Sequence, residues 1–172
     1  NPTPIASASL AQVHEGYLNG EKIALKVQFP YLKDDFNIDL TVLGLVFWGV
    51  ETFFPEYDLR WMHKEIEHNI TKDLDFVNET KNSEQTERNL SDIPHVYIPK
   101  IKWKYTSKRV LVMEFIDGIK INELDRLRKA GFAIAEICET TLTAMASMIF
   151  EHGFVHCDPH PGNLFVRREP KT

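Results

Sequence analysis

The sequence is poor in cysteine, has no excess of basic residues and contains no unbroken apolar run of membrane-spanning length. Its two cysteines, Cys138 and Cys157, are too few for a disulfide framework, so we expect free thiols in a reducing compartment. A formal net charge of −5 without a dense Lys/Arg stripe argues against nucleic acid as a partner. With 43% hydrophobic and 26% charged residues, the chain has the composition of one globular domain.

The most apolar segment, residues 40–54, is interrupted by two threonines and by Glu51. It falls short of the roughly 18 unbroken apolar residues that a membrane-spanning helix needs. We therefore predict an amphipathic helix over residues 33–53 that is buried against the rest of the domain and ended by Pro55.

Two strands joined by a tight turn are predicted near the N-terminus. Asn19-Gly20 is a strong two-residue hairpin signal, and the strands beside it cover residues 13–18 and 21–28. The second strand alternates between a predicted core face and an opposite face: Ile23, Leu25 and Val27 lie on the first, and Ala24, Lys26 and Gln28 on the second.

Helices over residues 59–89 and 131–151, the second ended by Gly153, and short strands over 108–115 and 163–166 complete the predicted elements. The order of hairpin, helices, strand, helix, polar loop and strand predicts an α+β, two-lobed fold like that of the protein kinases. Many α+β domains share this order, so the assignment to a kinase-like fold must rest on sequence motifs.

Residues 156–163 read His-Cys-Asp-Pro-His-Pro-Gly-Asn, which has the His-x-Asp-x-x-x-x-Asn spacing of a kinase catalytic loop. In that chemistry Asp158 accepts or orients the proton of the attacking hydroxyl, and Asn163 holds Mg²⁺. We expect His156 and His160 to support these two side chains. The alternatives are a proline-rich turn that Asp158 caps, or a zinc site formed by His152, His156, Cys157 and His160. No distant Cys/His pair completes a zinc-finger spacing.

Lys26 lies in Ile-Ala-Leu-Lys-Val, residues 23–27, which resembles the strand on which kinases carry their phosphate-binding lysine. Ala24, on the same face, would be the small residue beneath adenine. Taken alone, a strand lysine is usually only solvated. Together with the loop around Asp158, the pattern predicts that Lys26 and Asp158 are catalytic.

The segment before this strand, residues 4–14, has the position of a glycine-rich phosphate loop but contains no glycine. Small side chains still let backbone N–H groups approach phosphates, although each Cβ removes most of the freedom to adopt positive φ. The residues predicted to contact the nucleotide here are Ala6, Ser7, Ala8, Ser9 and Ala11.

Three motifs together make the chain resemble the ABC1/UbiB (aarF-domain) family of atypical kinases over its whole length. They are Ala-x-Ala-x-x-x-Gln-Val-His at residues 6–14, Lys-Val-Gln-x-Pro at 26–30 and His-x-Asp-Pro-His-Pro-Gly-Asn at 156–163. The resemblance implies a small β-rich lobe with family-specific helices over about residues 1–112, a hinge at 113–118 and a partial helical large lobe at 119–172.

The resemblance also implies an acidic element on a small-lobe helix, at Asp73 and Asp75, followed by Glu79 as the partner of Lys26. Asp73 departs from the family pattern, where Glu is usual. Asp75 and Glu79 are one helical turn apart and can face the same cleft. Without the resemblance, these carboxylates would read as a solvated helix face.

Residues 111–116, Leu-Val-Met-Glu-Phe-Ile, resemble the hinge whose backbone binds adenine in kinases. Met113 would be the gatekeeper, and Glu114 and Ile116 would also contact the nucleotide. The alternative is a core strand with one exposed Glu.

By resemblance, the parent protein is expected to bind ATP, ADP and Mg²⁺ as an atypical kinase or ATPase. It would support ubiquinone biosynthesis or mitochondrial lipid homeostasis at the inner membrane, with lipid surfaces and other mitochondrial proteins as further partners. One alternative is a nucleotide-binding pseudokinase that regulates partners or binds membrane lipid, which the alanine-rich loop and the exposed-looking helix over residues 40–54 suggest. Another is a small-molecule kinase of the aminoglycoside-phosphotransferase type, which lacks the alanine-rich loop. The phosphoryl acceptor is not indicated.

Two family elements are not in the sequence: a Lys-x-Gly-Gln extension and the metal-binding Asp-Phe-Gly-type motif expected after Val166. The sequence also begins at Asn1 without Met, a basic region or an apolar targeting region. We therefore expect an excised piece, truncated before the metal-binding Asp and inactive by itself, because a phosphoryl-transfer site without that Asp loses a principal Mg²⁺ ligand.

Overall fold

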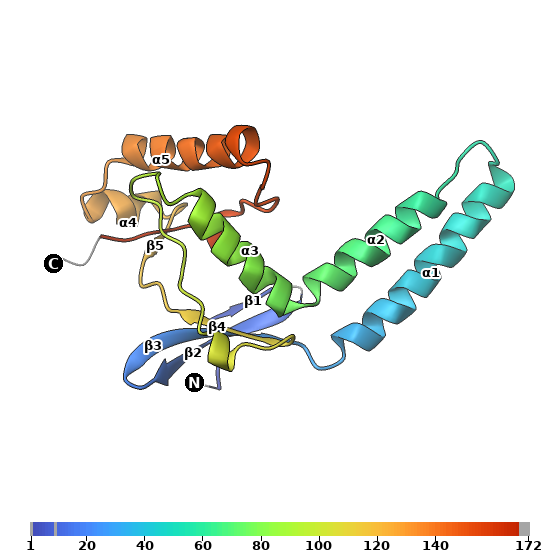
Figure 1. Ribbon diagram of the computed structural model, residues 1–172, viewed down its shortest axis with the longest axis horizontal. Helices are drawn as coiled ribbons and strands as arrows, with labels where there is room; N and C mark the ends of the chain where they lie inside the picture. Colours follow the sequence, from blue (N-terminus) through green and yellow to red (C-terminus); the bar gives the residue numbers. More distant parts are fainter. Residues whose placement is uncertain (1, 9, 169–172) are drawn as a thin grey trace. The chain divides into compact units, whose positions relative to one another are not determined.

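The computed structural model describes residues 2–8 and 10–168, which form two compact units (Figure 1). The first unit runs to Lys81 and also contains Ile101–Met113. The second contains Asn82–Lys100 and the residues from Glu114 onward. The division therefore falls within one helix and at the end of one strand.

The first unit contains a sheet whose strands follow the order β1-β2-β3-β4. Their bounds are β1 Ala6–Ser7, β2 Ala11–Leu18, β3 Glu21–Gln28 and β4 Val110–Glu114. The predicted hairpin is confirmed: β2 and β3 are antiparallel, with Leu18 opposite Glu21. Asn19 and Gly20 both have positive φ, 51° and 86°, as a tight turn matched to the twist of the strands requires.

The core of this unit lies partly on the β3 face that we predicted to be opposite the core. Ala24 and Gln28 are buried, as is Ile23 on the other face. The nearby cluster of Ala11, Phe76 and Leu111 is fully or almost fully buried, with Ile101 packed against it. The prediction of a core face is confirmed at Ile23 but was incomplete, because alternation identifies the two faces of a strand but not the helix that covers the second one.

Helix α1 spans Leu32–Phe53, close to the predicted range, and lies side by side with α2, Arg60–Asp73 (Figure 1). The prediction that α1 is buried is wrong. None of its described residues is buried, and Trp48 and Phe53 are 68% and 81% exposed. Apolar side chains occur around most of α1, so its one partner helix covers only a strip of them.

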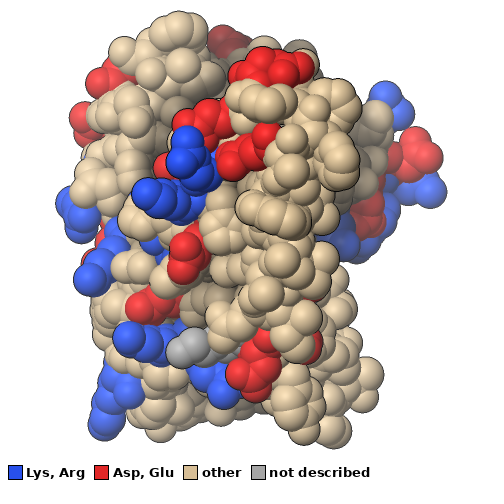
Figure 2. Space-filling view, turned by 90° about the vertical axis from the view of Figure 1, so that its right-hand side faces the viewer, with Lys and Arg blue, Asp and Glu red and all other residues tan. Residues whose placement is uncertain are grey.

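By length and composition, residues 34–53 of α1 would suffice to cross a membrane, a test that core helices and signal sequences also pass. Figure 2 looks from the side of the α1–α2 pair and shows a broad surface without charged side chains. The Lys, Arg, Asp and Glu side chains lie around its edges, many of them on the left of the view.

The single helix predicted over residues 59–89 is two helices, α2 and α3, with α3 spanning Phe76–Asn89. The break occurs because Asp75 caps a new helix: its Oδ1 accepts a hydrogen bond from Val77 N at 3.0 Å. The N–H of Phe76 donates to Lys108 O at 3.1 Å instead of continuing α2. A 3₁₀ turn, η1 Trp103–Tyr105, precedes β4.

The second unit contains α4 Leu124–Lys129, α5 Ile134–Ala146 and the π-helical turn η2 Ser147–Glu151. A small antiparallel pair, β5 Ile119–Lys120 and β6 Phe165–Val166, flanks the 3₁₀ turn η3 Pro161–Asn163. The core cluster of the second unit comprises Leu90, Ala144 and Met148, with Ile93, Val96 and Met145 packed against it. Gly153 follows the helix with φ 58°, as predicted for its end.

Candidate functional site

Lys26 and Glu79 form a two-pronged ion pair in the first unit. Lys26 Nζ lies 2.7 Å from Glu79 Oε1 and 2.8 Å from Oε2. The same ammonium lies 4.9 Å from the centroid of the Phe76 ring, within cation–π range. The predicted pairing of these two residues, 53 positions apart in sequence, is therefore present in the structure.

The ion pair is positioned by the start of α3. Glu79 lies in the first turn of that helix, which Asp75 caps through its carboxylate. Asp75 Oδ2 also lies 3.8 Å from the exposed Lys108 Nζ. The structure thus brings Glu79 to Lys26 and leaves Asp75 at the helix start, while Asp73 is the last residue of α2. Because the pair is partly exposed, we expect it to matter more for geometry than for stability.

The small-residue loop is a short hairpin. Ala6 and Ser7 form β1 and pair with Val13 and Gln12. The N–H of Ala8 donates to Ala11 O at 2.9 Å, which closes the turn. Ser9, also predicted to contact nucleotide, lies outside the described residues. Ala11 is fully buried beside Phe76 and Leu111, so it shapes the loop from the core and offers no surface to a ligand.

The predicted catalytic loop lies in the second unit, and its two histidines hold its backbone. Asp158 N donates to His156 Nδ1 at 3.2 Å, and Gly162 N donates to His160 Nδ1 at 3.0 Å. Each neutral histidine must therefore carry its proton on Nε2. Asn163 Nδ2 donates to Asp158 O at 3.3 Å, which fixes the two key residues in one turn.

The donor set at this loop suits Mg²⁺ better than zinc. With its Nδ2 used in the loop, Asn163 has its amide oxygen left to bind a cation, and Asp158 adds a carboxylate. Mg²⁺ takes few protein oxygens and keeps water and phosphate oxygens as its other ligands. Over residues 2–8 and 10–168 the structure contains no group of three or more His, Cys, Asp or Glu able to hold a metal, which argues against the zinc alternative.

Glu114, predicted to lie in the hinge, has a structural role in the second unit. Its carboxylate accepts hydrogen bonds from Tyr97 Oη and, at 3.3 Å, from Arg167 Nη1. The Arg167 guanidinium lies 4.2 Å from the Tyr97 ring centroid. Partial desolvation of the hydroxyl and its hydrogen bond to Glu114 raise the pKa of Tyr97, although 45% of the residue is exposed. This Glu is half-buried and paired, which corrects the alternative of an exposed one.

Part of the hinge backbone is already hydrogen-bonded within the protein. Glu114 N donates to Lys100 O at 2.9 Å, so only its carbonyl remains for an adenine amino group. Met113 bridges to Ile101 in the first unit and is half-buried, and Ile116 is half-buried in the second. Their contacts with nucleotide stay predictions.

Sequence reasoning missed Phe76, Tyr97 and Arg167. Phe76 fell inside a predicted helix, and nothing local marks it as the ring beneath a lysine. Tyr97 and Arg167 reach Glu114 only through tertiary packing.

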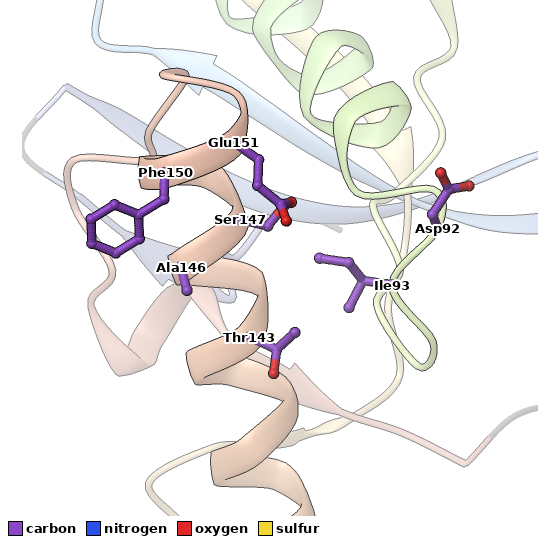
Figure 3. Close-up of a pocket in the computed structure, with 7 residues that line it drawn as sticks. All are labelled: Asp92, Ile93, Thr143, Ala146, Ser147, Phe150 and Glu151. Atoms are coloured by element: carbon purple, nitrogen blue, oxygen red, sulfur yellow. The ribbon is translucent and has the colours of Figure 1, made fainter.

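The second unit also contains an open pocket of about 570 Å³ between α5, η2 and the turn after α3 (Figure 3). Thr143, Ser147 and Glu151 face it from one side, and Asp92 and Ile93 lie across from them. Ser147 Oγ donates to Glu151 Oε2 within the π-helical turn. None of the predicted site residues lines this pocket.

The fold belongs to the kinase-like class. A solved Mycobacterium tuberculosis protein, Rv3197 in complex with erythromycin, superposes with a TM-score of 0.76 at 25% identity, over 96% of this chain and 42% of that one. The family model of the ABC1 atypical kinase-like domain matches residues 1–172. The chain therefore belongs to the ABC1 atypical kinase-like family.

Relatives in distant organisms agree with this assignment. A protein of Arabidopsis thaliana named as an ABC1 protein is 41% identical over 176 residues, covering 99% of this chain and 33% of that protein. AarF domain-containing kinase 1 of Drosophila melanogaster is 39% identical over 170 residues, covering 98% of this chain and 33% of the relative. AarF domain-containing protein kinase 1 of Xenopus tropicalis is 38% identical, with 98% and 32% covered. The chain spans about a third of the length of these relatives.

Proposed function

We propose that the protein containing this chain binds Mg-ATP and catalyses phosphoryl transfer, to water or to an acceptor still to be identified. The observation that supports this most directly is the two-pronged contact of Lys26 with Glu79, at 2.7 and 2.8 Å. In protein kinases a strand lysine held by a helix glutamate binds the nucleotide phosphates. An ammonium aligned in this way is ready to receive phosphate oxygens.

The remaining roles follow from where each residue lies. Ala6, Ser7 and Ala8 would present backbone to the phosphates, with Ser9 predicted beside them. Ala24, Met113, Glu114 and Ile116 would enclose adenine. Asp158 would orient the attacking hydroxyl and accept its proton, while Asn163 would hold Mg²⁺, which supplies charge neutralisation on the phosphates. His156 and His160 would keep the loop in shape through their Nδ1 atoms.

The biological setting is also a proposal. Family resemblance favours a role in ubiquinone biosynthesis or mitochondrial lipid homeostasis at the inner membrane. The exposed apolar helix α1 supports a membrane surface or another mitochondrial protein as a partner, since an uncovered apolar face favours association.

A nucleotide-binding pseudokinase is the second candidate, and α1 favours it as well. In this role ATP occupancy would regulate binding to partners or to membrane lipid, without turnover. Trp48 and Phe53 would enter the lipid interface, where aromatic side chains are favoured. Unchanged binding of the full-length protein to lipid vesicles with and without ATP would count against this candidate.

The first experiment is a thermal-unfolding measurement on the full-length protein with Mg-ATP. A ligand at about 100 times its Kd stabilises the protein by roughly 2.7 kcal/mol, which gives a clear shift in Tm. We expect wild type and Lys22→Met to shift and Lys26→Met not to shift. Lys22 is the matched control because it lies on the same strand and pairs with Glu15 at 3.0 Å. An equal shift in Tm for Lys26→Met would refute the proposed contact between Lys26 and phosphate. No shift in wild type would refute nucleotide binding.

A further inference from the structure

Gln28 is a buried amide at the end of β3, on the same face of the strand as Lys26. It is only 9% exposed, and its Nε2 donates to Leu74 O at 2.7 Å and points to Lys108 O at 3.4 Å. A buried polar side chain stays favourable only when its hydrogen bonds are satisfied. The two carbonyls therefore explain why an amide occupies this site, and they show what it holds.

Both carbonyls belong to the junction at which α3 begins. Leu74 is the residue that ends α2, directly before the capping Asp75. Lys108 O also accepts the N–H of Phe76, the first residue of α3, at 3.1 Å. Gln28 and Phe76 thus share one acceptor, so the side chain on β3 and the first turn of α3 are fixed against the same point.

The junction is close to the ion pair on both sides. Glu79 lies about one helical turn after Phe76, so a shift of the helix start moves its carboxylate by a similar amount. Lys26 lies two residues before Gln28 and points to the same side of the strand. Gln28 consequently links the element that carries the ammonium to the element that carries the carboxylate.

We propose that Gln28 is a positioning residue that sets the start of α3 against β3 so that Glu79 meets Lys26. This role rests on the proposed nucleotide function for its consequence in catalysis, and the contacts it makes are independent of nucleotide. Glu in its place would direct carboxylate oxygens at two carbonyls, and Met would fill a similar volume without a donor. An amide is the neutral side chain of this length that can donate to both.

Hydrogen–deuterium exchange on the full-length protein without nucleotide tests whether Gln28 holds the start of α3 in place. We expect Gln28→Met to raise exchange over residues 74–81 by about tenfold, the loss expected from one net hydrogen bond, and Gln28→Glu to raise it further. Gln85→Met is the matched control, because half-buried Gln85 bonds Asn89 Oδ1 on α3 and leaves the junction untouched. Unchanged exchange at 74–81 in both Gln28 variants would overturn the proposal.

Steady-state kinetics with Mg-ATP tests whether Gln28 positions Glu79 for its ion pair with Lys26. Gln28→Met should lower kcat/KM in wild type and have little further effect in a Glu79→Gln background, because both changes remove the same positioning. Independent, additive losses would mean that Gln28 only stabilises the fold, and would overturn the proposal. If wild type neither binds nor turns over ATP, the proposed function fails while the exchange measurement still decides on Gln28.

Discussion

At the scale of single residues, Lys26 shows how an ion pair and a cation–π contact together fix one ammonium. Its Nζ is held by both oxygens of Glu79 and lies over the face of Phe76, which is 1% exposed. The ring is immobile because it belongs to the core, so it limits where the lysine can go. The Glu79 carboxylate then directs the Lys26 ammonium toward α3.

Replacing Glu79 by Gln should therefore affect nucleotide more than folding. We expect Glu79→Gln to lower kcat/KM for Mg-ATP by about 10- to 100-fold, because the two-pronged ion pair that aligns Lys26 becomes a single hydrogen bond to a neutral amide oxygen. The free energy of unfolding should change by less than about 1 kcal/mol, since the pair is partly exposed. Glu15→Gln, which alters the pair with Lys22, is the control and should leave kcat/KM unchanged.

Tyr97 offers a test by pH. Its pKa is raised by partial desolvation and by its hydrogen bond to Glu114, so the folded state disfavours the phenolate. The resulting stabilisation is complete below the unfolded pKa of about 10 and is lost as the pH rises through the raised folded value. The difference between the ultraviolet titrations of wild type and Tyr97→Phe isolates the phenol of Tyr97, which should ionise above its ordinary pH range. A Tyr97 that ionises at its ordinary pH would contradict the cluster with Glu114 and Arg167.

At the scale of elements, His63 makes a close contact between α1 and α2. His63 on α2 places its Nε2 3.0 Å from Leu40 O on α1, and the edge of its ring meets Phe47. Gly44 makes room for that ring, because a Cβ there would lie 3.2 Å from His63 Nε2. A Cβ at Gly49, five residues further along α1, would have nothing within 4 Å.

These two glycines make a matched pair of variants. Gly49→Ala should stabilise the protein by about 0.5–1 kcal/mol, the ordinary gain of Ala over Gly in a helix. Gly44→Ala receives the same gain but must displace His63, so its net stabilisation should be smaller or negative. Urea unfolding measures the free energy of unfolding of both variants. Equal stabilisation by the two would show that His63 does not pack on Gly44.

At the scale of the whole molecule, the groups proposed to bind phosphate and those proposed to perform chemistry belong to different units. Lys26 and Glu79 lie in the first unit, while Asp158 and Asn163 lie in the second. Binding and turnover should therefore respond separately to mutation.

Asp158→Asn provides that separation in the full-length protein. We expect it to keep the Mg-ATP-dependent shift in Tm and to lower turnover by about 10²- to 10⁴-fold, the range for removal of a general base. Cys157→Ser, at the neighbouring exposed position, is the control and should keep both. Full turnover in Asp158→Asn would refute the proposed role of Asp158 as the base, whereas an absence of turnover in wild type that still binds Mg-ATP would favour the pseudokinase candidate.

The sequence by itself determined the features that depend on near neighbours. Asn19-Gly20 turns the chain because both residues tolerate positive φ, and the spacing within residues 156–163 identifies a loop in which both histidines and Asn163 bond the loop's own backbone. The family followed from three such motifs, and the kinase-like fold followed from the family.

Only the tertiary structure decided which surfaces are covered and which distant residues meet. It placed a core cluster on the Lys26 face of β3, divided the predicted helix at Asp75 and left the described residues of α1 unburied. It also gave Gln28 its two carbonyls, which lie 46 and 80 positions away in sequence. The physical reason is that periodicity describes one element at a time, whereas burial and long-range hydrogen bonds depend on which elements pack together.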